Sequence, residues 1–211
     1  MRFFIENPDY LIFKNRMIWV VQCRYTFVAQ KQLSVMKKSD LPRQPSYFDT
    51  YINQVDDIEL SEAFRQSVVA IDALDLNTLR AIGDQVYAPG KWTLRDLFQH
   101  LIDAERIFAY RALRFARNDK TALPGFNENF FAENAGANHR PWEDILGELR
   151  HVRESSMFLF HSFEQAALHR TGVMFNSELP VLAIAFTIVG HQIHHFRIME
   201  ERYFTMLKMK V

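Results

Sequence analysis

The stretch of sequence that most limits the possible fold runs from residue 181 to residue 195. Residues 181–189 are apolar nearly all round a helical projection, which is typical of a helix buried within a bundle. Three of the eight histidines follow within five residues, at His191, His194 and His195. A chain with this segment needs other helices to cover it, so the sequence predicts an all-α fold.

Three further segments carry apolar residues at helical spacing. The first extends over residues 47–74 and has a short lead-in. The second begins at Thr93, which has an acid in the capping-box position, and runs to about residue 117. The third begins at Pro141, a residue favoured in a first helical turn. The helix that contains residues 181–195 is the fourth, and it is expected to be capped by Ser177 and to reach about residue 207.

These four helices predict a four-helix bundle with a long connection between the second and third helices. That connection, residues 118–140, contains five asparagines and a Pro-Gly pair, and it is longer than most loops. The connection lengths are compatible with either an up-down or a crossed order of helices.

The charge of the chain is unevenly distributed. Residues 1–38 carry seven Lys or Arg and two acidic residues, whereas residues 39–211 carry 18 basic and 23 acidic residues. We therefore expect a basic N-terminal extension, residues 1–40, and a bundle domain, residues 41–211. Met36 would be an ordinary first residue for a protein, so one hypothesis is that residues 1–35 come from a misassigned upstream start codon. The alternative, to which we give equal weight, is a native, β-prone extension that packs on the domain.

The composition argues against several classes of function. Lys plus Arg and Asp plus Glu both total 25, so no overall charge favours a nucleic-acid partner. The apolar run at residues 17–21 is too short to span a membrane, and no signal-peptide cleavage site follows it. Cys23 is the single cysteine, which excludes an intrachain disulfide and a thiolate-cluster zinc site and favours a cytoplasmic location.

Helical phase distinguishes the three clustered histidines. Residues four apart lie on the same helical face, so His191 and His195 can bind one metal ion. They share an apolar stripe, whereas His194 shares a stripe with charged residues and is expected at the surface or beside the ligands. The H-x-x-x-H pair is a weak motif alone, and Gln192 replaces the glutamate that a metallopeptidase requires.

A metal site needs a third ligand, and His100 is the best candidate. It lies on the apolar face of the second helix, and Asp103 one turn later could accept a hydrogen bond from an imidazole and fix its tautomer. Three histidines leave a position open for water or substrate, which is the arrangement of catalytic zinc. A hydrogen-bonded core role for His100 is the alternative. The remaining histidines lie in expected loops or on a charged helix: His139, His151, His161 and His169.

Several separated blocks of the sequence resemble the DinB family of damage-inducible proteins and the wider DinB/YfiT-like superfamily of metal-dependent enzymes. These blocks are residues 87–93 (YAPGKWT), 100–106 (HLIDAER), 123–126 (LPGF) and 190–195 (GHQIHH). The resemblance covers roughly residues 47–204. It implies a four-helix bundle with one metal ion held by His100, His191 and His195.

The resemblance also implies a chemistry. Relatives join a low-molecular-weight thiol, such as bacillithiol, mycothiol or glutathione, to an electrophile, or use such thiols in isomerisation. A divalent ion could stabilise a thiolate or activate water, so a thiol S-transferase and a hydrolase are both expected. The expected metal ion is zinc or nickel, and iron or copper is also possible because imidazole binds these metals as well.

The expected substrate is a small molecule. The candidate contacts are Trp92 and Arg106 near the second helix and Arg202, which is expected two further turns along the stripe of His191 and His195. The competing interpretation is a non-catalytic metal-binding protein of the stress response, in which the bundle serves as an interaction surface in a homodimer.

Overall fold

The computed structural model describes residues 12–13, 16–17, 35–41, 48–174 and 177–208. The chain divides into two compact units, Met1–Gln30 and Lys31–Val211. In the first unit, β1 (Ile12–Phe13) and β2 (Arg16–Met17) form an antiparallel pair. Cys23 lies outside the described residues.

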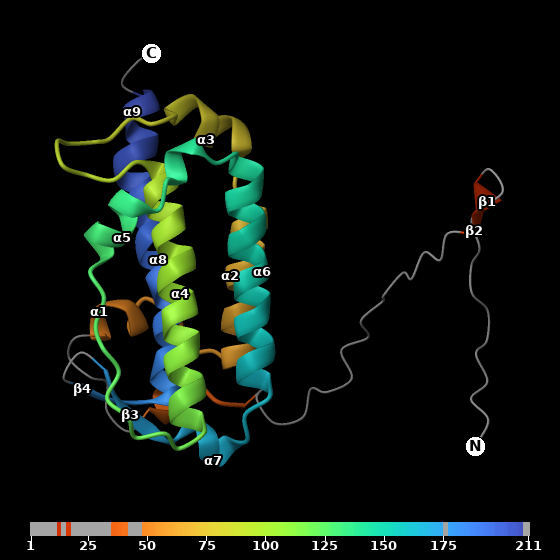
Figure 1. Cartoon of the computed structure of the whole chain (residues 1–211), viewed down its shortest axis with the longest axis vertical. Helices are drawn as coiled ribbons and strands as arrows, with labels where there is room; N and C mark the ends of the chain where they lie inside the picture. The colour runs from red at the N-terminus through yellow and green to blue at the C-terminus, as the bar shows by residue number, and fades with distance from the viewer. Residues whose placement is uncertain (1–11, 14–15, 18–34, 42–47, 175–176, 209–211) are drawn as a thin grey trace. The chain divides into compact units, whose positions relative to one another are not determined.

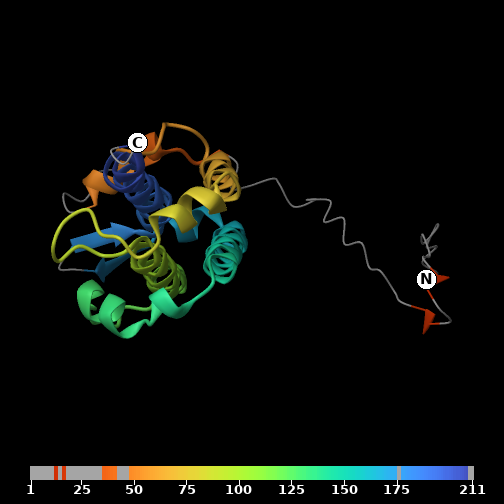
Figure 2. The ribbon, with the colours of Figure 1, turned by 90° about the horizontal axis from the view of Figure 1, so that it is seen from above.

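The second unit contains the predicted four-helix bundle, whose members are α2 (Leu60–Asp72), α4 (Leu94–Ala116), α6 (Trp142–His161) and α8 (Val181–Ile198). Helices α2 and α4 each pack against both α6 and α8, so α2 lies diagonally opposite α4. The view along the bundle in Figure 2 shows this arrangement.

The bundle has the crossed order of helices. Figure 1 shows α4 and α6 running in one direction and α2 and α8 running in the other. Because α4 and α6 are parallel, the chain between them must return along the full length of the bundle. This connection contains α5 (Glu128–Asn134) and the short helix η2 (Ala137–His139), both packed against α4.

Local sequence signals explain how α4 and α6 begin. Thr93 Oγ1 accepts a hydrogen bond from the Asp96 amide at 3.1 Å, and the Asp96 carboxylate accepts one from the Thr93 amide at 3.1 Å. This reciprocal pair is the expected capping box and satisfies two amides of the first turn. Pro141 is the N-cap of α6.

The expected cap of the last helix at Ser177 is wrong. Residues Ser177–Pro180 form strand β4, which pairs antiparallel with β3 (Thr171–Met174). Cross-strand pairing holds Ser177 in an extended conformation, and α8 begins only after Pro180, its N-cap. The helical conformation continues to about residue 207 as expected, but residues Met199–Phe204 form a π-helical segment between α8 and α9 (Thr205–Lys208).

Four further short helices complete the described part of this unit. They are η1 (Lys38–Asp40), α1 (Asp49–Ile52), α3 (Leu76–Ile82) and α7 (Gln165–Leu168). The single helix expected over residues 47–74 is thus two helices, α1 and α2, and the sequence analysis missed α3. Met36 and Leu41 are buried in this unit, and the Met36 carbonyl accepts a hydrogen bond from the Leu60 amide at 2.8 Å. The boundary at residue 40 and the start at Met36 stay predictions.

A buried ion pair joins α4 to α6 within the core. Arg153 donates to both carboxylate oxygens of Glu105, with Nε–Oε1 and Nη2–Oε2 distances of 2.9 Å. The two side chains are 1% and 3% exposed, respectively. The pair is therefore buried in the core together with the apolar residues around it.

None of the described helices is long and apolar enough to cross a membrane.

Candidate metal centre

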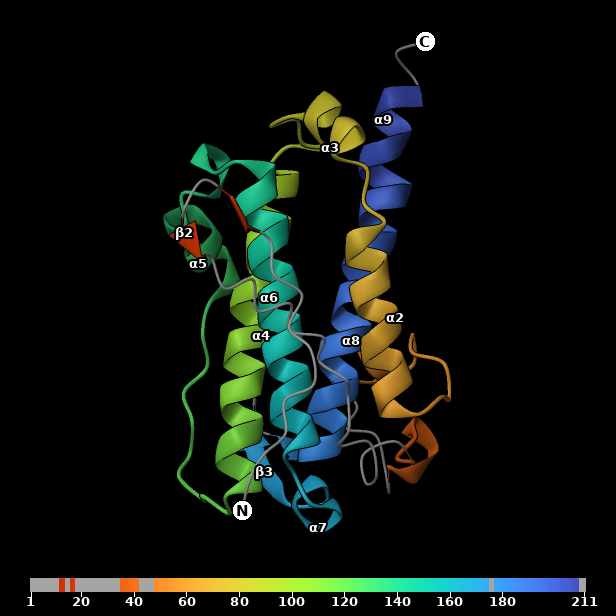
Figure 3. The ribbon, with the colours of Figure 1, turned by 90° about the vertical axis from the view of Figure 1, so that its right-hand side faces the viewer.

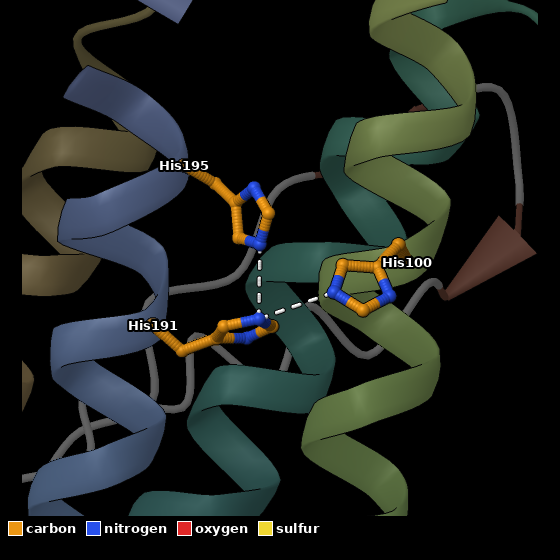
Figure 4. A group of neighbouring side chains, drawn as sticks. All are labelled: His100, His191 and His195. Atoms are coloured by element: carbon orange, nitrogen blue, oxygen red, sulfur yellow. Dashed lines mark hydrogen bonds between the residues drawn. The ribbon is translucent and has the colours of Figure 1, made fainter. Parts of the chain in front are cut away.

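Three histidine side chains meet between the facing helices α4 and α8. His100 extends from α4, and His191 and His195 extend from α8, as Figure 4 shows. The His191 Nε2 atom lies 3.1 Å from the Nε2 of His100 and 3.0 Å from the Nε2 of His195. The structure thus brings together the three residues that sequence analysis selected.

The spacing of these nitrogens fits a metal ion. Two nitrogens bound at about 2.0–2.1 Å to a tetrahedral zinc ion lie about 3.3 Å apart, close to the observed separations. The metal-compatible group found among the described residues consists of these three histidines alone, and its candidate ligand atoms lie within 4.8 Å of one another. The donor set is therefore three imidazoles.

The electrostatic environment keeps the imidazoles uncharged. Burial lowers the pKa of His100 to about 4, against an opposing effect from the charge of Glu128. Burial also lowers the pKa values of His191 and His195 well below the usual value, and the neighbouring histidines lower them further. Neutral imidazole is the form that binds metal ions, so the site is ready for a metal at neutral pH.

These shifts predict how the stability of the metal-free protein depends on pH. The unfolded chain protonates His100 near pH 6.5, whereas the folded chain does so only near pH 4. Between these values the unfolded state binds more protons, so the free energy of unfolding should fall as the pH decreases, by up to about 3 kcal/mol from this residue. Urea unfolding of EDTA-treated protein across this range measures the slope. His100→Gln should make it shallower, and an unchanged slope would contradict the assignment.

Aromatic side chains enclose the three imidazoles. The ring centroid of Trp92 lies 4.8 Å from that of His100, and the ring centroid of Tyr51 lies 5.0 Å from that of His191. The Nδ1 atom of His195 is buried and has no hydrogen-bond partner within the described part of the chain. This largely apolar surrounding lowers the local dielectric constant and so strengthens interactions with an ion bound at the Nε2 atoms.

A glycine allows Tyr51 to approach the histidines. Helix α1 packs directly on α8, and a Cβ atom added at Gly190 would lie 2.0 Å from the Tyr51 carbonyl oxygen. Sequence analysis missed Tyr51 because the contact joins residues far apart in the chain. The glycine inside an otherwise bulky helix was the available signal of a close approach.

Gly190→Ala is expected to lower the free energy of unfolding by about 1–3 kcal/mol, because the new methyl group overpacks the contact between α1 and α8. Gly147→Ala is the matched control on α6, where nothing lies within 4 Å of an added Cβ atom. That control should raise the free energy of unfolding by about 0.5–1 kcal/mol through helix propensity. Thermal and urea unfolding of both variants test this difference, and effects of the same sign would contradict it.

A cavity of about 230 Å³ opens beside the histidines, and His195 forms part of its wall. Its lining also includes Lys91, Trp92, Asn129 and Tyr203, and the Tyr203 hydroxyl donates a hydrogen bond to the Trp92 carbonyl oxygen at 2.5 Å. A larger cavity of about 610 Å³ shares some of this wall. The polar residues that line the larger cavity are Lys91, Asp96, Asn129, Glu133, Asn138 and His139.

Two candidate residues on α4 have partners other than the three histidines. Asp103 Oδ1 accepts a hydrogen bond from Gln99 Nε2 at 2.9 Å, and burial raises the pKa of Asp103. No hydrogen bond to an imidazole is found for Asp103 among the described residues. Arg106 forms an ion pair with Glu148 on α6, at 2.5 Å.

The other candidates differ in their distance from the cluster. Trp92 lies against His100 and lines both cavities. His194 turns toward α1, where its Nδ1 lies 3.3 Å from Gln54 Nε2. Arg202 is exposed and is absent from the described lining of the cavity beside His195. The π-helical segment that begins at Met199 changes the helical phase, so Arg202 no longer follows the histidine stripe.

Sequence analysis also missed Lys91, Asn129 and Tyr203 in the cavity wall. Lys91 belongs to the YAPGKWT block, which carries family resemblance but gives no local sign of what the lysine faces. Asn129 belongs to the long connection, whose return past α4 could not be placed from its composition.

Comparisons with known proteins agree with this fold. A protein of Geobacillus thermodenitrificans named "Putative metal-dependent hydrolase" is 28% identical over 141 residues, which are 65% of this chain and 74% of the relative. The structure of YfiT from Bacillus subtilis, described as "a probable metal-dependent hydrolase with an unusual four-helix bundle topology", matches with a TM-score of 0.59 at 18% identity, over 78% of this chain and 92% of YfiT. The family model of the DinB superfamily matches residues 44–199. The chain therefore belongs to the DinB superfamily.

Proposed function

We propose that the protein is a metal-dependent enzyme in which His100, His191 and His195 hold one divalent ion. The observation that carries this proposal is the convergence of three uncharged imidazoles beside a cavity that His195 lines. A structural metal site is normally closed by four protein ligands, whereas a catalytic site keeps one position open. The donor set of three nitrogens favours zinc or nickel and is also compatible with iron or copper.

The reaction that we propose is transfer of an electrophilic group to a low-molecular-weight thiol. When bound, the ion would supply Lewis-acid activation of a thiol or of water at neutral pH. The larger cavity supports an organic cosubstrate, because it offers Lys91 and Glu133 as charges of opposite sign beside several amides. Hydrolysis is the second candidate, supported by the printed descriptions of the two relatives.

The side chains of the protein have separate roles in this proposal. Trp92 covers His100 and excludes water from that side of the cluster. The Tyr203 hydroxyl holds the backbone of Trp92 and so positions the wall of the cavity. Lys91 and Asn129 line both cavities, where they can orient a small polar substrate toward the histidines.

The test is a comparison of two reactions by the metal-loaded protein. One reaction contains an aryl-halide electrophile with glutathione, bacillithiol or mycothiol, and the other contains a nitrophenyl ester without thiol. We expect metal-dependent product formation that His195→Ala abolishes and His194→Ala retains. Product that requires the thiol indicates a transferase, and product without it indicates a hydrolase. Stoichiometric metal binding without turnover in either reaction would overturn the enzymatic proposal in favour of a non-catalytic metal-binding protein.

A further inference from the structure

The long connection between α4 and α6 is tied to α4 at two points. At the first point, Arg111 Nη2 donates a hydrogen bond to the Pro124 carbonyl oxygen at 2.8 Å. At the second point, Asn138 Nδ2 donates a hydrogen bond to Asp96 Oδ1 at 3.2 Å. Residues 125–137 lie between these points and are called the α5 segment, and Figure 3 shows α5 on the outside of the bundle, beyond α4.

Helix α5 is weakly attached to the bundle. None of its seven residues is buried, and the side chains of Phe130 and Phe131 are 60% and 39% exposed. Within the described part of the chain, the hydrogen bonds of the α5 side chains stay inside the segment, as when Asn134 Nδ2 donates to the Phe130 carbonyl oxygen at 2.7 Å. Elements with few buried contacts open locally at a small cost in free energy. Helix α5 can therefore move while the four long helices stay packed.

One face of α5 forms part of the wall of both cavities near the candidate metal centre. Asn129, Ala132 and Glu133 follow the i, i+3, i+4 spacing of one helical face, and all three line the cavity of about 610 Å³. Asn129 also lines the cavity of about 230 Å³, to which His195 contributes. The turn at residues 90–92 lines both cavities as well. Movement of α5 away from this turn would widen the passage to the histidines.

Glycines at both ends of the α5 segment permit this movement. Gly125 directly follows the tied residue Pro124. Gly136 has a φ of 63°, which lies in the left-handed region that glycine favours, and nothing lies within 4 Å of a Cβ atom added there. Hinges are a few loop residues, often small ones, that absorb the change in backbone angles when a lid moves.

We infer that the α5 segment is a flap that opens and closes over the two cavities and controls access to His100, His191 and His195. This inference rests on the metal centre proposed above. Long loops in compact domains often serve as lids of active sites, and the connection that contains α5 is of this kind.

The first test is hydrogen–deuterium exchange of the full chain without metal. Helix α3 is the matched control, because it also has seven residues but buries Leu79 and Ile82. The amides of α5 should exchange at least about tenfold faster than those of α3, because so short a helix does not stay folded in water once it leaves the bundle. Exchange in α5 as slow as that in α3 would overturn the inference.

The second test measures whether movement of the flap controls access to the ion. Cys23→Ser removes the single native thiol, and Lys91→Cys with Asn129→Cys introduces two thiols at exposed positions, one on the turn and one on α5. The reagent 1,2-bis(maleimido)ethane then tethers α5 to the turn. The zinc-loaded, tethered protein should release its ion to EDTA at least about tenfold more slowly than the same variant without the tether.

N-ethylmaleimide on the same two thiols is the control, because it adds similar bulk without joining the two sides. This protein should release zinc nearly as fast as the unmodified variant. Equal rates with and without the tether, or equal slowing by N-ethylmaleimide, would overturn the inference. Failure of the unmodified variant to bind zinc would instead refute the proposed metal centre. The exchange measurement needs no metal, so the two failures are distinguishable.

Discussion

Glu105→Ala is expected to lower the free energy of unfolding by about 3–5 kcal/mol, the typical cost of leaving one member of a buried ion pair uncompensated. The substitution leaves the guanidinium of Arg153 in the core, where the side chain is 1% exposed. One face of that guanidinium lies over the ring of Phe64 at 5.8 Å, and the described residues offer no second carboxylate to it. Urea unfolding monitored by circular dichroism measures the loss.

Two further variants separate the cost of an unpaired charge from the cost of lost volume. The double substitution Glu105→Leu and Arg153→Met removes both charges and should recover most of the stability, because apolar replacements of a buried pair are often neutral or stabilising. Glu62→Ala breaks an exposed pair with Arg65 and should leave the melting temperature nearly unchanged. A double variant as unstable as Glu105→Ala alone would show that the ion pair itself is essential to the core.

Each of the substitutions His100→Ala, His191→Ala and His195→Ala is expected to weaken metal binding by more than about 100-fold. Changes to residues that only support a ligand cost about 10–100-fold in affinity, so loss of a ligand should exceed that range. Competition with a chromophoric chelator measures the affinity, and elemental analysis measures the stoichiometry.

His194→Ala is the matched control for these variants. His194 directly precedes His195 on the same helix, yet its Nδ1 contacts Gln54 Nε2 and not the three Nε2 atoms that converge. The control should retain the affinity of the wild type. Equal losses for His194→Ala and His191→Ala would show that the effect comes from disturbing α8 and not from removing a ligand.

The parts of the fold that could be predicted are those with strong local signals. The apolar segment at residues 181–189 marked a buried helix, and the Thr93 capping box marked the beginning of α4. Helical phase also separated His194 from His191 and His195, because i and i+4 residues share a face whatever the tertiary fold. His100 could be selected because it is a polar residue on an apolar helical face.

The parts that could not be predicted depend on contacts between residues far apart in sequence. Pairing with β3 made Ser177 part of a strand, and a π-helical segment removed Arg202 from the histidine stripe. Asp103 was expected beside an imidazole but accepts a hydrogen bond from Gln99, one turn earlier on its own helix. The partner of Glu105 lies 48 residues away on α6, a distance at which spacing carries no information.

The most direct test of the three-histidine metal centre is X-ray diffraction from crystals of the zinc-loaded protein, with data collected at the zinc absorption edge. We expect one strong anomalous peak between α4 and α8, about 2.0–2.1 Å from Nε2 of His100, His191 and His195. A peak elsewhere in the protein, or three ordered histidines with no peak between them at saturating zinc, would contradict this assignment.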